Sequence, residues 1–104
     1  MTIITDEGVL LCPQCGYQCT YHEAITVFDR LGEDAESTFL TRVCSYGTVT
    51  RLVPSSEVDN PSNRRHGLAI EFSCEGCNGI SELTVAQHKG ETQLEVRVIR
   101  LRSI

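Results

Sequence analysis

Residues 68–79 read Leu68-Ala69-Ile70-Glu71-Phe72-Ser73-Cys74-Glu75-Gly76-Cys77-Asn78-Gly79, and they join a strand pattern to a pair of cysteines. In the first half, Leu68, Ile70 and Phe72 alternate with smaller or charged residues. Alternation with a period of two predicts a β-strand with one apolar face. The second half is a C-x-x-C pair, whose tight turn brings two sulfur atoms to one point.

A second pair lies near the start of the chain, in Cys12-Pro13-Gln14-Cys15-Gly16, after the apolar run 9–11. Each pair is therefore expected at the end of a strand. Gly16 and Asn78 follow their pairs at positions where such a turn needs a positive φ. Two facing pairs make a closed set of four thiolates, which is the ligand set of a structural zinc site. The sequence thus predicts one structural Zn²⁺ at Cys12, Cys15, Cys74 and Cys77.

Several alternatives to this site remain open in the sequence. Cys19 and His22 extend the first pair to C-x-x-C-x-x-x-C-x-x-H, a conceivable local site that would leave the second pair unexplained. The first pair also resembles a rubredoxin knuckle, so the four thiolates could hold iron. Disulfides are a further alternative, and a small apolar role is expected for Cys19 and Cys44.

The rest of the chain repeats the period of two. It predicts strands over 21–28, 46–53, 80–87 and 93–101, and a weaker one over 39–43, whereas no window of eleven or more residues keeps a helical stripe. We therefore expect one mostly β domain over residues 1–104, a zinc-ribbon-like antiparallel sheet of about five or six strands with little or no helix. The sequence also predicts a long loop over 54–67, a hairpin turn over 88–91, and core positions for Phe28, Phe39 and Phe72.

Composition and charge narrow the possible functions. The 104 residues carry nine basic and fourteen acidic side chains, a formal charge of −5, which disfavours nonspecific nucleic-acid binding. No apolar run reaches the roughly 18 residues of a membrane span. The first residues lack the features of a signal peptide, so we expect a cytoplasmic protein with reduced thiols. No nucleophile elbow, phosphate-binding loop or H-E-x-x-H motif is present, so no enzymatic activity is expected.

Two polar segments are the candidate partner contacts. Arg64-Arg65-His66 is a basic cluster in the long loop, and Gln87-His88-Lys89 is the tip of the last hairpin. The leading hypothesis is a non-catalytic, zinc-stabilised adaptor or regulatory module that binds a protein. Four thiolates and one Zn²⁺ lower the formal charge to about −7, which favours basic partners.

The alternative functions belong to other classes. A zinc-ribbon nucleic-acid-binding protein would use Arg64, Arg65, Lys89 and the C-terminal arginines, namely Arg97, Arg100 and Arg102. An iron-thiolate redox protein is a third hypothesis. A monomer and a homodimer are both compatible with the sequence.

Three stretches together resemble one group of proteins. These are Cys12-Pro13-Gln14-Cys15-Gly16-Tyr17, residues 60–77 and residues 86–90. They are similar to small zinc-ribbon proteins of actinobacteria and of their phages or mobile elements, and the resemblance spans most of the chain. It implies a zinc-binding, cytoplasmic and phage-linked setting. It transfers no activity to this chain.

Overall fold

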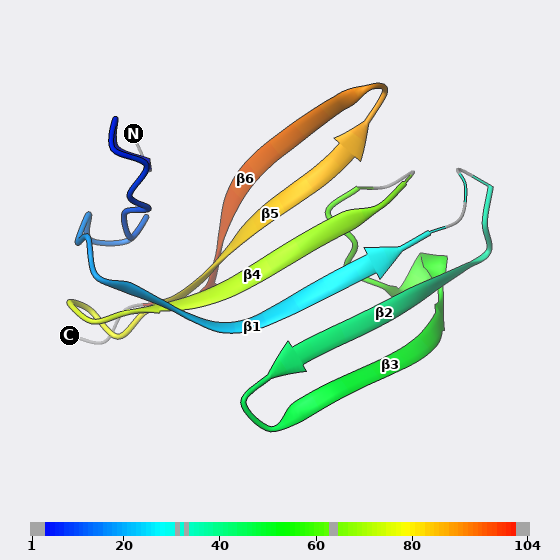
Figure 1. Cartoon of the computed structure of the whole chain (residues 1–104), viewed down its shortest axis with the longest axis horizontal. Coiled ribbons are helices and arrows are strands. Elements are labelled where there is room, and N and C mark those ends of the chain that lie inside the picture. Colours follow the sequence, from blue (N-terminus) through cyan, green and yellow to red (C-terminus); the bar gives the residue numbers. More distant parts are fainter. Residues whose placement is uncertain (1–3, 31, 33, 63–64, 102–104) are drawn as a thin grey trace.

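The computed structural model describes residues 4–30, 32, 34–62 and 65–101, and it forms one six-stranded sheet (Figure 1). The strands are β1 (Thr20–Asp29), β2 (Ser37–Cys44), β3 (Gly47–Pro54), β4 (Gly67–Cys74), β5 (Ile80–His88) and β6 (Glu91–Arg100). All neighbouring strands are antiparallel, and a 3₁₀ turn at Ser55–Glu57 is the one helical element of the described residues. The prediction of a mostly β fold with little helix is confirmed. None of the described residues forms a helix that is long and apolar enough to cross a membrane.

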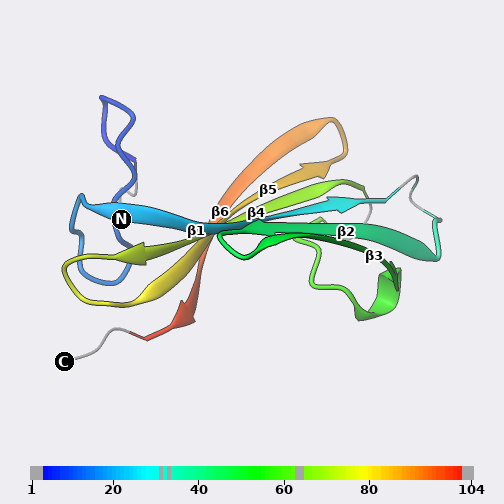
Figure 2. The ribbon, with the colours of Figure 1, turned by 60° about the horizontal axis from the view of Figure 1, so that its bottom comes forward.

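The strand order, β3-β2-β1-β4-β5-β6, consists of two meanders placed side by side. In each meander consecutive strands are neighbours in the sheet, and the first strands of the two, β1 and β4, pair with each other. Because β3 lies at an edge and β4 in the centre, the connection over 55–66 has to cross one face of the sheet. Figure 2 shows this connection on one side of the sheet and the N-terminal segment on the other. The long loop predicted over 54–67 overlaps this connection, but Pro54 belongs to β3, Gly67 belongs to β4, and residues 63–64 lie outside the described residues.

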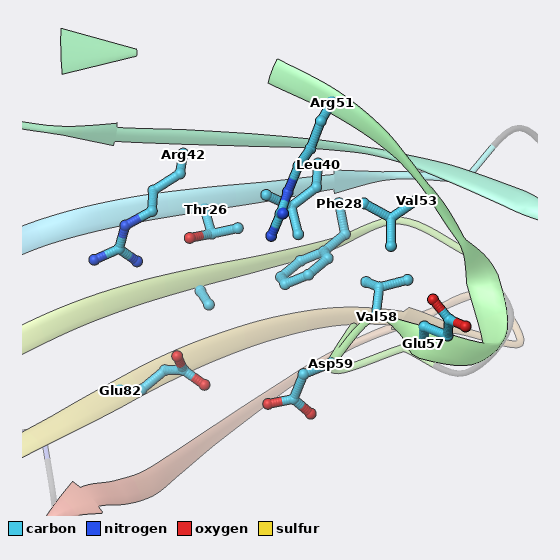
Figure 3. Close-up of a pocket in the computed structure, with 11 residues that line it drawn as sticks. Thr26, Phe28, Leu40, Arg42, Arg51, Val53, Glu57, Val58, Asp59 and Glu82 are labelled. Carbon is cyan, nitrogen blue, oxygen red and sulfur yellow. The ribbon is translucent and has the colours of Figure 1, made fainter. Parts of the chain in front are cut away.

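The face beneath the connection is called the covered face here. Val58 of the connection lies next to Phe28 of β1 (Figure 3), and Asp59 of the connection and Ala69 of β4 line the same hollow. Arg97 of β6 ties the connection to the sheet, because its guanidinium group pairs with Glu82 of β5 and with Asp59, the latter at 3.3 Å. Small side chains let the connection approach closely, and the buried residues of this face are Ala24, Phe28, Thr38, Ala69, Thr84 and Ala86.

The opposite face, called the apolar face here, carries most of the large aliphatic side chains. In-register pairing gives it Ile25, Val27, Phe39, Val43, Leu52, Leu68, Ile70, Leu83, Val85, Leu94, Val96 and Val98. Phe72 also lies on this face and is fully buried, next to its strand partner Ser81, which accepts a hydrogen bond from Gln14 of the N-terminal segment at 3.3 Å. Phe28 and Phe72 are thus confirmed as core residues. The prediction for Phe39 is wrong, since its side chain is 44% exposed on the part of the apolar face that the described residues leave uncovered.

Gly67 fixes the approach of the crossing connection to β4. A Cβ atom at this position would lie 2.1 Å from Asn60 Oδ1 and 2.8 Å from the Pro61 ring. The Asn60 side chain cannot turn away freely, because its amide nitrogen donates to the Arg65 carbonyl at 2.9 Å and its oxygen accepts from the Ser62 N–H at 3.1 Å.

We therefore expect Gly67→Ala to lower the free energy of unfolding by about 1–3 kcal/mol, the usual cost of overpacking a closed contact. Urea unfolding of the two proteins measures this difference. Gly32→Ala is the matched control, since no atom lies within 4 Å of a Cβ there. Equal unfolding midpoints for Gly67→Ala and the wild type would contradict the packing described here.

Candidate metal centre

The four cysteines of the two C-x-x-C pairs come together at one end of the sheet. Their sulfur atoms all lie within 4.8 Å of one another. Cys12 Sγ is 3.7 Å from Cys77 Sγ, and Cys15 Sγ is 3.5 Å from Cys74 Sγ. A tetrahedral zinc site with Zn–S bonds of about 2.3 Å requires sulfur–sulfur distances of about 3.8 Å. These distances fit a four-thiolate metal site and are much too long for a disulfide bond of about 2.05 Å.

The two pairs adopt the same backbone turn. In the first, the Cys12 N–H donates to the Tyr17 carbonyl at 2.9 Å and the Gly16 N–H donates to the Cys12 carbonyl at 2.8 Å. In the second, Cys74 donates to Gly79 at 3.1 Å and Asn78 donates to Cys74 at 3.0 Å. Gly16 and Asn78 occupy the equivalent position with φ of 80° and 58°. The repeated turn is the local reason why each pair presents two sulfurs to one point.

Contacts distant in sequence hold the two turns against each other. The Gln14 side-chain amide of the first turn donates to the Arg100 carbonyl at 2.9 Å and to Ser81 Oγ at 3.3 Å. The Glu75 N–H of the second turn donates to the Cys19 carbonyl at 3.1 Å. The first turn is therefore tied to β5 and β6, and the second turn is tied to Cys19 just after the first turn, without any metal bond.

The expectation that the first pair follows a strand is wrong. Residues 9–11 form no strand, and Leu10 makes only an isolated bridge with Ile4. The chain turns back at Gly8, whose φ is 84°, and the Val9 N–H donates to Thr5 Oγ1 at 3.1 Å. The first regular strand is β1, which begins at Thr20 after the first turn and pairs with the end of β4.

Burial and charge explain why this cluster suits a cation. Cys12, Cys74 and Cys77 are buried, whereas Cys15 is exposed. Burial raises the pKa of the Cys12 thiol. Burial acts in the same direction on Cys74, but hydrogen bonds from the Cys77 N–H, the Cys15 sulfur and the Gly76 N–H hold the pKa of Cys74 below its usual value. Four adjacent thiolates repel one another, so a divalent cation is needed for all four to ionise together.

The structure places the other cysteines and His22 outside this cluster. Cys19 precedes β1, and its backbone carbonyl accepts a hydrogen bond from the Glu75 N–H of the second turn. His22 is an exposed residue of β1, next to the bulge after that position. Cys44 is the last residue of β2 and pairs with Ala24. None of the six cysteines forms a disulfide bond. Among the described residues, the potential metal ligands that come together are the four cysteines of the two C-x-x-C pairs.

Most of the predicted partner-binding residues meet in one hollow. Arg65, His66, Gln87 and Lys89 line a space of about 340 Å³ between the end of the crossing connection and the tip of the β5–β6 hairpin. The Gln87 N–H donates to the His66 carbonyl at 3.2 Å and so joins the two segments. His88 is not among the lining residues, and the predicted contact Arg64 lies outside the described residues. This group is called the basic hollow below.

A second hollow, of about 320 Å³, lies on the covered face beneath the crossing connection. Figure 3 shows Arg42 and Arg51, from β2 and β3, across from Glu82 and Asp59. The Arg42 guanidinium group pairs with Glu71 at 3.4 Å. Sequence reasoning missed this grouping because its charges come from four separate segments. Only the strand register and the path of the connection bring them together.

Comparisons with protein-family models, with curated proteins and with solved structures found no match for this chain. The class of protein is therefore defined by the fold and the site. The chain is an all-β protein with one antiparallel sheet and a four-cysteine cluster at its end that is compatible with a metal ion.

Proposed function

We propose that the protein is a non-catalytic binding module whose fold is stabilised by one structural Zn²⁺, and that it docks a protein partner at the basic hollow. The observation that carries the proposal is the cluster of four sulfur atoms that all lie within 4.8 Å of one another, a size that one four-thiolate metal ion would fill. Four protein ligands close the coordination shell of zinc, so no position is left for a substrate or a catalytic water. The metal then stabilises the fold without taking part in chemistry.

The basic hollow supplies the docking chemistry. Arg65 and Lys89 contribute two positive charges, and the side chain of Gln87 adds an amide. His66 faces an acidic neighbour, with its Nδ1 atom 3.2 Å from Asp29 Oδ1. Charges farther apart than about 8 Å are largely screened at physiological salt, so local charge decides what binds here despite the overall charge of −5. The matching partner is a protein that presents an acidic side chain to this hollow.

Nucleic-acid binding is the weaker alternative. Arg97 is engaged by Glu82 and Asp59, and Arg100 donates to the Asn78 carbonyl at 3.3 Å. Two of the C-terminal arginines are thus bound within the protein. A nucleic-acid interface would need a larger surplus of free positive charge than the basic hollow supplies.

The docking proposal predicts a charge-dependent partner. We expect the wild type, used as bait in a nuclease-treated lysate of the cells that make it, to retain a protein that the double variant Arg65→Glu, Lys89→Glu retains at least about tenfold less. Arg51→Glu is the matched control, because this arginine lies on the covered face away from the basic hollow. Quantitative mass spectrometry of the captured proteins measures the ratio. Equal capture by the wild type and the double variant would contradict the proposal, and so would capture from an untreated lysate that is lost when the lysate is treated with nuclease.

A further inference from the structure

The apolar face is the unexplained feature of this fold. Domains normally bury such a face between two packed layers. Here the described residues form one sheet, and the main contacts between its elements are those of neighbouring strands, with the 3₁₀ turn lying against β2. Leu52 and Leu94 on the two edge strands are each 59% exposed, and Val27 in the centre is 42% exposed. The regular alternation of the strands therefore produces an apolar face. The described part of the chain covers this face only at the end of the sheet where the two cysteine turns lie.

The exposed area is large enough for a stable interface. The chain exposes 6838 Å² of surface, whereas a compact monomer of its 11.5 kDa exposes about 5,800 Å². Its radius of gyration is 14.6 Å, against about 13 Å for a compact domain of this length. The excess of about 1,000 Å² refers to the whole chain, and burial of the roughly 800 Å² that each partner contributes to a standard interface would bring the exposed surface close to that of a compact protein.

Charge indicates which partner fits this face. Asp29, at the end of β1, is the charged residue that strand register places on the apolar face. The other charges within the paired strands, such as Arg42, Glu71 and Glu82, lie on the covered face. In a two-fold symmetric contact each patch meets its own copy, so a charged face would repel itself while a neutral face does not. A basic partner would find few carboxylates to pair with here, although the chain as a whole is acidic.

We propose that a second copy of this chain covers the apolar face, so that two sheets pack face to face in a symmetric β-sandwich. Sheets packed in this way lie about 10 Å apart with their side chains interdigitated. The first cysteine turn, which Gln14 holds against Ser81, borders this contact at one end of the sheet. The basic hollow lies at the opposite end of β5, at the tip of the β5–β6 hairpin. The interface uses none of the cysteine ligands, so it stands independently of the metal proposal.

Two variants on one strand test this interface. Leu52 and Val49 both lie on β3 and are 59% and 62% exposed, but Leu52 is on the apolar face and Val49 on the covered face. Sedimentation equilibrium of the metal-loaded protein over a concentration series measures the dimer dissociation constant. We expect a dimer for the wild type and for Val49→Lys. We expect Leu52→Lys to raise the dissociation constant at least about a hundredfold, because it places a lysine charge in an apolar interface.

Leu94→Lys on β6 is the second variant, and it should dissociate the dimer as Leu52→Lys does. Circular dichroism and metal content show whether each variant stays folded. We expect both variants to fold, because both leucines are highly exposed in the single chain. A wild type that stays monomeric over the whole series overturns the proposal. So does a dimer that survives both leucine variants, which would place the contact at a strand edge, or one that Val49→Lys weakens equally.

Discussion

Cys74→Ser is expected to abolish metal binding and to unfold the protein at 25 °C. Cys74 is buried at the end of β4, where it pairs with Thr20 at the start of β1. A structural zinc contributes about 10–16 kcal/mol to the folding of small zinc domains, which equals or exceeds the roughly 5–15 kcal/mol of total stability of an ordinary domain. The described residues include few large buried side chains, Phe28 and Phe72 among them, so packing cannot replace a contribution of this size.

Circular dichroism and elemental analysis of the same sample measure this effect. Cys44→Ser is the matched control, because Cys44 is a strand residue outside the four-cysteine cluster. We expect the control to keep its metal and to keep the wild-type free energy of unfolding to within about 1 kcal/mol. A Cys74→Ser protein with the wild-type spectrum and midpoint would show that the fold does not depend on a metal at this site.

Mild acid is expected to release the metal and unfold the protein in one steep step between about pH 7 and pH 5. The metal-bound state holds four thiolates without protons, whereas a free cysteine has a pKa of about 8.5 and is protonated throughout this range. The unfolded state therefore binds about four more protons than the folded state. The free energy of unfolding must then increase with pH. It decreases by about 5 kcal/mol for each unit by which the pH is lowered. The pKa of the Cys12 thiol, which burial raises, favours protonation further.

Zinc release to a chromogenic chelator, followed together with circular dichroism over a pH series, measures this step. The two signals should change at the same pH and recover together on neutralisation. Cys44→Ser should show the same profile, since its thiol is not among the ligands. Stability that stays constant between pH 7.5 and pH 5 would contradict the four-thiolate account, because disulfide bonds or thiols without metal release no such set of protons.

The strands were predictable because the period of two is local information. The alternation of Leu68, Ile70 and Phe72 is preserved in β4, and the strand predicted weakly over 39–43 is the central part of β2. The pairing of β1 with β4 was not predictable from this pattern, because it joins segments about forty residues apart. The path of the crossing connection was not predictable either, because it depends on the order of the strands in the sheet.

Alternation also shows that a face is apolar without showing what covers it. Phe39 was expected in the core for this reason, yet it lies on the apolar face and is 44% exposed. The fully buried positions of the covered face are small residues such as Ala69 and Thr84, which a hydrophobic pattern does not mark as core. The run over 9–11 was mistaken for a strand because three consecutive apolar residues carry no periodicity.

The convergence of two sulfur atoms within each C-x-x-C pair was predictable from spacing, because each turn is local. The residues that hold the turns together were not, since Gln14 reaches Ser81 and Arg100 only in the folded sheet. The basic hollow was predictable only in part. Its two segments were visible as polar breaks, and the Gln87–His66 backbone contact that joins them is tertiary.

Native mass spectrometry of the purified protein, combined with elemental analysis of the same sample, tests the central claim most directly. The account predicts one zinc ion per chain, bound with Cys12, Cys15, Cys74 and Cys77 as thiolates, while Cys19 and Cys44 remain free thiols. A red protein that contains iron would contradict the zinc assignment. A metal-free chain whose mass is lower by two hydrogen atoms for each cysteine pair would replace the metal site with disulfides and contradict the account as a whole.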